Sequence, residues 1–132
     1  MKISSLVFRV ADLEKAIDFY TQVLDLVVVL RDSNFALLKS VDGSQVYLHG
    51  QNADRTSGHL GLHAASWTAD SMSHLEAIES RLKDRKAYRR TIKHDDYVVL
   101  EGRDPDGAIV LVSYPGPMES ARRTIISSIA TW

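Results

Sequence analysis

Histidine offers this chain its main route to acid–base or metal chemistry, because the sequence contains no cysteine. His49, His59 and His63 lie close together in the sequence. Imidazoles transfer protons near neutral pH, and three of them can hold zinc or iron. The lack of cysteine excludes disulfides, thiolate metal sites and a cysteine nucleophile. The three histidines could therefore form a metal site, or they could bond a ligand or one another.

Two charged residues fall inside segments that look like strands. Arg9 could clamp a carboxylate or a phosphate through its planar guanidinium group, or it could form a salt bridge to a neighbouring strand. Glu101 could act as a general base if it were buried. Its direction is ambiguous because Gly102, the next residue, could carry a β-bulge. We expect Glu101 to face solvent.

An internal repeat supplies the framework that must position these side chains. Residues 42–48 (DGSQVYL) recur as residues 106–112 (DGAIVLV), and each copy reads as a turn followed by an apolar strand. The pattern predicts strand, helix and three strands in each half. The expected strands are residues 3–11, 26–30, 34–39, 45–49, 59–64, 88–93, 97–103 and 108–113. The first helix is capped by Asp12, and the second starts at about Asp70.

The length of 132 residues fits one small domain. We place module one at residues 1–49, a polar linker at 50–58, module two at 59–114 and a tail at 115–132. The tail resembles an amphipathic helix with an apolar side. That helix could pack on its own domain or contact a second subunit. Its apolar side consists of Ile125, Ile126, Ile129 and Trp132.

Strand alternation predicts which side chains share a face. One face is wholly apolar and should pack against the helices: Leu6, Phe8, Val10, Val46, Leu48, Leu60, Leu62, Ala64, Val110 and Val112. The other mixes apolar, aromatic and polar groups, as small-molecule sites do, although a solvated sheet face would look similar. The expected ligand-binding residues on this face are Val7, Arg9, Tyr47, His49, His59, His63, Leu111 and Ser113.

Composition narrows the classes of partner. The net charge of −1 and the pI of about 6.5 give no electrostatic drive toward nucleic acid or an anionic membrane. No apolar stretch approaches bilayer-spanning length, and the N-terminus lacks the apolar core of a signal peptide. We therefore expect no nucleic-acid or membrane partner and a cytoplasmic location, which the lack of cysteine fits.

The order of these features resembles the vicinal oxygen chelate superfamily, which includes glyoxalase I, extradiol dioxygenases, fosfomycin resistance enzymes and bleomycin resistance proteins. The resemblance covers residues 3–114. It rests on VADL at 10–13, FY at 19–20, VL at 23–24, HLGL at 59–62 and DPDG at 104–107. Asp25 departs from the pattern, because the family usually has glycine after the first helix.

This resemblance implies an α+β fold of two βαβββ modules. Their curved mixed sheet would form a concave cup for a small molecule, with helices on the convex side, and the protein would be a homodimer. Metal-using members place ligands at positions that correspond to Ser5, Tyr47, His59 and Leu111. Leucine cannot coordinate a metal, and neutral serine and tyrosine are poor donors. We therefore expect no metal at this corner, no cofactor, and loss of the family's Lewis-acid chemistry.

Our first functional hypothesis is a metal-free small-molecule binding protein of the bleomycin-resistance type. Such a protein would sequester an aromatic natural product and so confer antibiotic resistance. Stacking surfaces could come from Tyr47, Trp67, Tyr97 and Tyr114, unless these are core residues. The alternative is a superfamily enzyme (a lyase, isomerase or dioxygenase-like protein) that uses cup histidines for acid–base chemistry or a displaced metal site. A third hypothesis is a non-catalytic dimer module.

Overall fold

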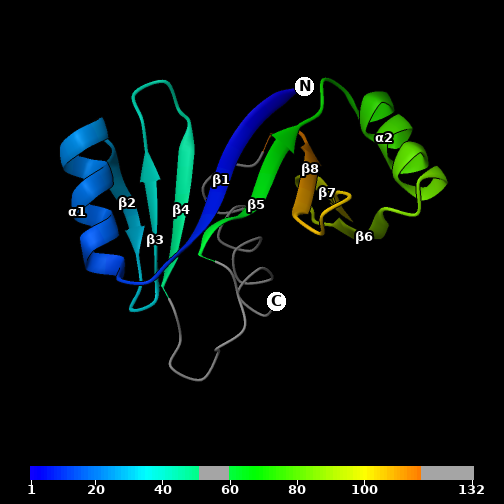
Figure 1. The fold of residues 1–132 in the computed structure, drawn as a ribbon. Helices are drawn as coiled ribbons and strands as arrows, with labels where there is room; N and C mark the ends of the chain where they lie inside the picture. The colour runs from blue at the N-terminus through cyan, green and yellow to red at the C-terminus, as the bar shows by residue number, and fades with distance from the viewer. Residues whose placement is uncertain (51–59, 117–132) are drawn as a thin grey trace. The chain divides into compact units, whose positions relative to one another are not determined.

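The computed structural model describes residues 1–50 and 60–116 (Figure 1). Strand, helix and three strands occur twice in succession, as the repeat predicts. The first set is β1 (Lys2–Val10), α1 (Leu13–Leu24), β2 (Val27–Arg31), β3 (Phe35–Lys39) and β4 (Gln45–Gly50). The second set is β5 (Gly61–Thr68), α2 (Met72–Asp84), β6 (Tyr88–Lys93), β7 (Val98–Arg103) and β8 (Ile109–Tyr114).

The described strands form an eight-stranded sheet in the order β2-β3-β4-β1-β5-β8-β7-β6. β1 runs parallel to β4, whereas β2–β3–β4 and β6–β7–β8 are antiparallel. The sheet is therefore mixed, and the expected α+β fold class is confirmed. Neither described helix is both long and apolar enough to cross a lipid bilayer.

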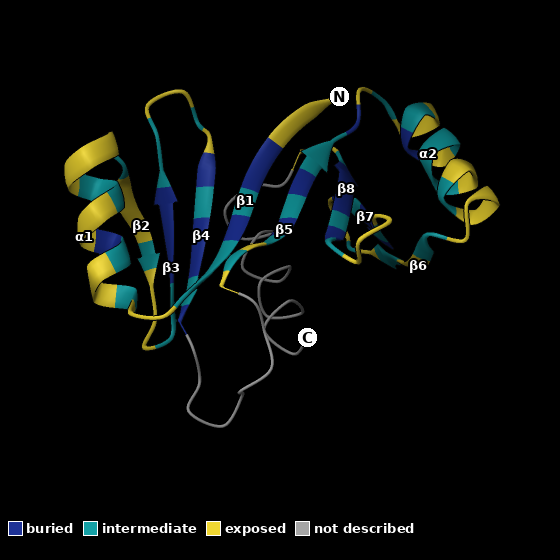
Figure 2. Ribbon diagram, in the orientation of Figure 1, coloured by how far each residue is buried: buried dark blue, intermediate teal, exposed yellow. Residues whose placement is uncertain are grey.

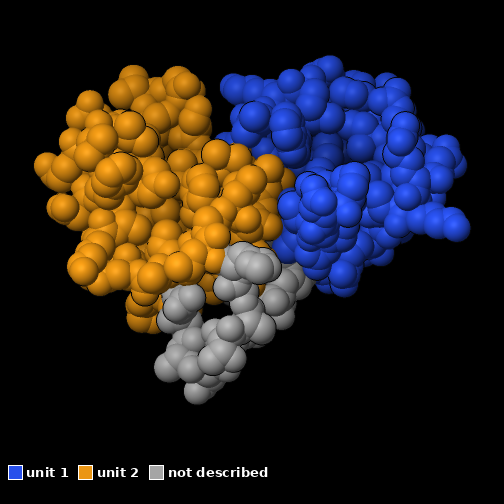
Figure 3. All heavy atoms as spheres, in the orientation of Figure 1, with its two compact units in different colours: residues 1–4, 66–132 blue, residues 5–65 orange. Residues whose placement is uncertain are grey.

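The chain divides into two compact units (Figure 3). Unit 2 comprises Ser5–Ala65, and unit 1 comprises Met1–Ser4 together with the described residues from Ser66 onward. The division falls inside β1 and β5, so both strands contribute residues to both units. All of the expected linker except Gly50 lies outside the described residues, as does the expected tail helix.

In unit 2, α1 begins where the sequence predicts. The Asp12 side chain accepts a hydrogen bond from the backbone N–H of Lys15 at 3.1 Å, which satisfies one of the exposed amides of the first turn. The helix packs Ile17 against Ala36, Leu38 and Leu48 of the sheet. It ends at Asp25, whose φ of 56° is left-handed.

In unit 1, α2 is capped by Ser71, one residue after the expected start. The Ser71 hydroxyl accepts from the backbone N–H of His74 at 3.0 Å. The buried core of this unit joins Leu75 of α2 to the sheet residues Leu100 and Val112. Lys86 follows the helix with a left-handed φ of 57°.

The predicted helix-facing set is confirmed for most of its members. Those that pack in the two helix-side cores are Phe8, Val10, Val46, Leu48, Val110 and Val112. Leu60 and Leu62 are instead exposed, so the prediction was wrong there (Figure 2). The reason is that α1 packs over β2, β3 and β4 and leaves β5 uncovered.

Candidate functional site

Five of the expected ligand-binding residues lie on one face of unit 2. They are Val7 and Arg9 on β1, Tyr47 and His49 on β4, and His63 on β5. The residues that alternate with them on β1 and β4 pack toward α1. The five therefore lie on the helix-free face of the sheet, as strand alternation predicts.

The strand register brings these side chains into two adjacent rows. Val7 lies opposite Tyr47, and Arg9 lies opposite His49. Val7 and Tyr47 are buried, whereas the three basic side chains are half-buried. The Arg9 Nη2 atom lies 3.4 Å from Nε2 of His63, which comes from the neighbouring strand β5. The face thus combines an apolar row with a row that carries a guanidinium group and imidazoles.

The remaining expected residues do not belong to unit 2 as described. Leu111 and Ser113 lie on β8 of unit 1, where both are buried and alternate with the helix-facing Val110 and Val112. His59 lies outside the described residues. The predicted set therefore falls on the helix-free faces of two units, and its assignment as a ligand site stays a prediction.

Glu101 on β7 is fully buried, so the expectation of a solvent-facing carboxylate was wrong. The register shift opposite Gly102 lies in β6, between Tyr88 and Arg90, and β7 pairs with β8 without a shift, so Gly102 itself carries no bulge. A Cβ at Gly102 would lie 2.9 Å from the Ala87 carbonyl and 3.0 Å from Leu82 of α2. Glu101 consequently faces away from α2, and its Oε2 accepts a hydrogen bond from Arg90 Nε at 2.6 Å.

Some of the aromatic residues considered as stacking surfaces are core residues. Trp67 and Tyr114 pack against the core beneath α2. Tyr97 and Tyr47 are both buried. Of these four rings, only Tyr47 belongs to the mixed strand face of unit 2.

The residues present do not fit the metal centre that the family resemblance implies. Leu111 has no donor atom, and Ser5 and Tyr47 offer only neutral hydroxyl groups. Among residues 1–50 and 60–116, no group of three or more histidine, aspartate or glutamate side chains could hold a metal ion. A metal-dependent step is therefore not part of the chemistry we derive for this face.

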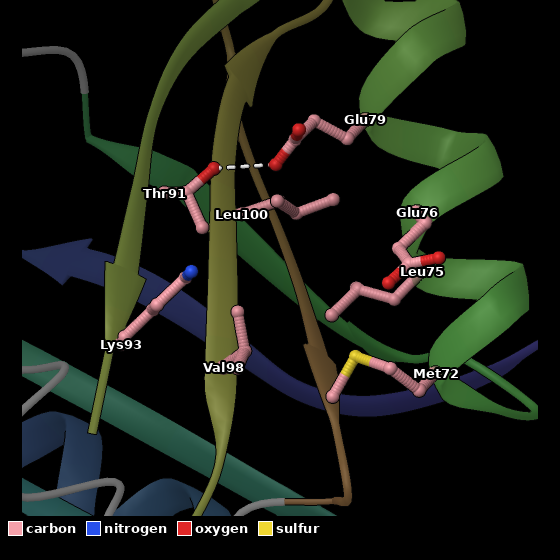
Figure 4. A pocket seen from close by; sticks show the side chains of 8 residues that line it. All are labelled: Met72, Leu75, Glu76, Glu79, Thr91, Lys93, Val98 and Leu100. Atoms are coloured by element: carbon pink, nitrogen blue, oxygen red, sulfur yellow. Dashed lines mark hydrogen bonds between the residues drawn. The ribbon is translucent and has the colours of Figure 1, made fainter.

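A separate cavity of about 410 Å³ lies between α2 and strands β6 and β7 of unit 1 (Figure 4). Its lining is Met72, Leu75, Val98 and Leu100, together with Glu76, Glu79, Thr91 and Lys93. Glu79 Oε2 accepts from Thr91 Oγ1 at 2.7 Å, and Oε1 accepts from Lys83 Nζ at 3.1 Å. These bonds, with that of Thr91 foremost, lower the pKa of Glu79. Of the expected site residues that the structure describes, none lines this cavity.

The structure contains two successive βαβββ modules that contribute to one mixed sheet, and the side of the sheet opposite the helices carries both polar and apolar side chains. These features define the class of proteins built from paired βαβββ modules. Residues 2–112 match the profile of the Glyoxalase/Bleomycin resistance protein/Dioxygenase superfamily. The chain belongs to this superfamily. A comparison with curated protein sequences gave no match.

Several solved structures share the fold at low sequence identity. One is a superfamily member from Vibrio splendidus 12B01, with 17% identity, a TM-score of 0.62, and coverage of 85% of this chain and 97% of that one. Methylmalonyl-CoA epimerase from Mycobacterium tuberculosis has 19% identity and a TM-score of 0.59, and the alignment covers 88% of this chain and 89% of the epimerase. The Mn(II)-bound glyoxalase from Novosphingobium aromaticivorans has 21% identity and a TM-score of 0.67. The alignment covers 85% of this chain but only 38% of that longer chain. These similarities show the fold alone.

Proposed function

We propose that this protein binds a small aromatic molecule without a metal, in the manner of the bleomycin-resistance branch of its superfamily. The helix-free face of unit 2 would hold the ligand, and sequestration of an aromatic natural product would be the biological outcome. The observation that carries this proposal is the row of Arg9, His49 and His63 beside the buried pair of Val7 and Tyr47.

The chemistry of this row favours an aromatic ligand that carries an anionic group. A guanidinium group matches a carboxylate through paired N–H donors, and its charge strengthens each bond. The tyrosine ring offers apolar surface in the adjacent row. An aromatic carboxylate would place its charge against Arg9 and its ring near Tyr47. The donor set at the family's metal positions supports a metal-free mode of binding.

We expect a panel of aromatic carboxylates, with benzoate as the smallest, to include compounds that raise the melting temperature, because a ligand of the native state stabilises it by mass action. Arg9→Ala should weaken the binding of such a compound about 10- to 100-fold, since hydrogen bonds between charged groups are lost. Arg9→Lys should bind with intermediate affinity because it keeps the charge but loses the planar fork. Isothermal titration calorimetry gives the affinities.

Arg31→Ala is the matched control for this experiment. Arg31 is an exposed arginine on β2 that pairs with Glu14 on α1, away from the proposed site. Its replacement should leave ligand affinity unchanged. The proposal fails if no aromatic carboxylate binds, or if Arg9→Ala and Arg31→Ala bind equally well.

The contact between Arg9 and His63 favours a second candidate, a superfamily enzyme that uses a cup histidine for acid–base catalysis. An imidazole held beside a guanidinium group is suited to proton transfer at a ligand that the arginine orients. If the protein turns over a bound compound, and His63→Gln abolishes this turnover while it retains the affinity for the compound, the enzyme hypothesis is favoured. Elemental analysis of protein purified without chelator tests the metal-dependent version, for which we expect no stoichiometric metal.

A further inference from the structure

Three buried oxygen atoms in unit 1 lack a hydrogen-bond partner among the described residues. They are Oε1 of Glu101 and the hydroxyl oxygens of Ser66 and Ser113. Relative exposures are 0% for Glu101 and Ser113 and 3% for Ser66. Folded proteins pair nearly all such groups, so each exception requires an explanation such as a bound water or a ligand.

The three atoms belong to one face of the sheet. Trp67, Leu100 and Val112 pack toward α2, so Ser66, Glu101 and Ser113, which alternate with them, face the other way. β8 lies between β5 and β7, and Ala69, the residue after β5, donates a backbone hydrogen bond to the Ser113 carbonyl at 2.9 Å. Three adjacent strands therefore each contribute one of these oxygen atoms.

The strand register places two of the three side chains close together. Glu101 lies opposite Leu111, and Val99 lies opposite Ser113, so Glu101 and Ser113 are diagonal neighbours. Such neighbours are separated by about 7–8 Å between Cα atoms, which lets one bound group reach both side chains. The surrounding side chains Val99, Ile109 and Leu111 are apolar and buried.

The ion pairs of Glu101 define what it can still bind. Its Oε2 accepts from Arg90 Nε at 2.6 Å, while Arg89 Nε lies 3.7 Å from Oε1. The two guanidinium groups offset the negative charge, so a further cation is not required. Oε1 nevertheless remains an acceptor without a hydrogen-bond donor. A neutral hydroxyl or amide N–H could donate a hydrogen bond to this oxygen. A serine hydroxyl could either donate a hydrogen bond to that ligand group or accept one from it.

We infer that Glu101 is a specificity-determining residue that, with Ser113, accepts a hydrogen bond from a neutral hydroxyl or amide N–H of a small molecule bound at the helix-free face of unit 1. This inference rests on the proposed function, because it assigns unit 1 a role in recognising the same kind of ligand. Molecules that lack such a donor would leave buried acceptors unpaired, and the protein would discriminate against them.

Benzyl alcohol and benzyl methyl ether provide a matched pair of probes, because methylation removes the hydrogen-bond donor and adds only one methyl group. In two-dimensional ¹⁵N NMR titrations, we expect benzyl alcohol to shift the amide signals of Val99, Leu111 and Ser113, with at least about tenfold weaker binding of the ether. Glu101→Gln and Ser113→Ala should each weaken the binding of benzyl alcohol several-fold. Each should also reduce the ratio between the affinities for benzyl alcohol and for the ether. Ser113→Ala keeps the test decisive if Glu101→Gln fails to fold.

Glu79→Gln is the control, because Glu79 is an ion-paired carboxylate of the same unit that faces the cavity under α2. It should leave the binding of both probes unchanged. Equal affinity for alcohol and ether, or alcohol binding that neither variant weakens, would overturn the inference and leave only ordered water at these atoms. Benzoate binding that depends on Arg9, measured on the same samples, shows separately whether the proposed function holds.

Discussion

Glu79 shows how a single side chain links α2 to the sheet of unit 1. Its carboxylate accepts hydrogen bonds from Thr91 of β6 and from Lys83 one turn further along the helix. Lys83 also lies over the ring of Tyr88, with its Nζ 4.8 Å from the ring centre. These contacts favour the ionised form of Glu79, and its pKa lies below the ordinary value for glutamate.

The lowered pKa of Glu79 leads to a pH-dependent contribution to stability. A carboxyl whose folded-state pKa is lowered stabilises the fold fully above its unfolded pKa of about 4.3, and the contribution is lost as pH falls through the folded value. We expect Glu79→Gln to lower the free energy of unfolding by about 1 kcal/mol at neutral pH. The difference from the unmodified protein should shrink below about pH 4.

Urea denaturation at a series of pH values measures this difference. Glu76→Gln serves as the control, because Glu76 is an exposed glutamate of the same helix that also lines the cavity and has no ion pair among the described residues. Its replacement should change stability little at any pH. A Glu79→Gln effect that stays constant down to pH 3 would contradict the assignment.

Arg9 and Glu101 show what residue-level prediction could and could not reach. Strand alternation on β1 was sufficient to place Arg9 on the face opposite α1, because Phe8 and Val10 flank it with apolar side chains. Glu101 was missed because the sequence does not reveal which strand carries a bulge. The irregularity lies in β6 between Tyr88 and Arg90, and β7 stays regular. Arg90, which pairs with the buried carboxylate, lies opposite it on the neighbouring strand β6 and could be recognised only from the strand register.

At the scale of elements, both described helices are followed by a non-glycine residue in left-handed conformation. Asp25 caps α1 with a φ of 56°, and Lys86 follows the cap of α2 with a φ of 57°. Glycine is favoured at such positions because its lack of a Cβ removes the steric penalty. Asp25 therefore keeps the left-handed backbone conformation that glycine would adopt at this position, and it does so at a conformational cost.

Replacing these residues with glycine should stabilise the protein. We expect Asp25→Gly and Lys86→Gly each to raise the free energy of unfolding by about 0.5–1 kcal/mol, with the larger gain at Lys86 because aspartate tolerates this conformation better than lysine. Thermal denaturation of the two variants and of their combination measures the effect. Ser80→Gly, within α2, should instead cost about 0.5 kcal/mol. A loss of stability in both cap variants would disprove the interpretation.

Element order followed from the sequence because local signals agree with the fold. The turn residues, the alternating strands and the N-cap Asp12 all act over a few residues, and the structure confirms them. The extent of β5 was less well predicted, since it runs from Gly61 to Thr68 rather than over residues 59–64. Its final residues are stabilised by pairing with distant strands, which local propensity does not report.

At the scale of the whole molecule, each unit has its own helix-side core, yet β1 and β5 supply residues to both units. Shared strands should make unfolding cooperative, because disrupting either core also releases a strand that the other unit needs. Leu38→Ala in unit 2 and Leu75→Ala in unit 1 should each cost about 3 kcal/mol, since both side chains are buried.

Differential scanning calorimetry tests this cooperativity. We expect a single transition in the unmodified protein and in each leucine variant, with the midpoint lowered in both. Val41→Ala is a suitable control, because Val41 is fully exposed in the turn between β3 and β4 and should leave the midpoint unchanged. Two resolved transitions, of which each variant moves only one, would show that the units unfold independently.

The sharing of β1 and β5 also limits how this gene could be divided. A break between residues 50 and 60 would give an N-terminal peptide without the Gly61–Ala65 stretch of unit 2. The C-terminal peptide would in turn lack Met1–Ser4, which unit 1 takes from the start of the chain. Neither piece would hold a complete folding unit, and each would carry what the other is missing. Such a pair has the features needed for a split reporter, in which the fold returns only when two separately encoded pieces meet.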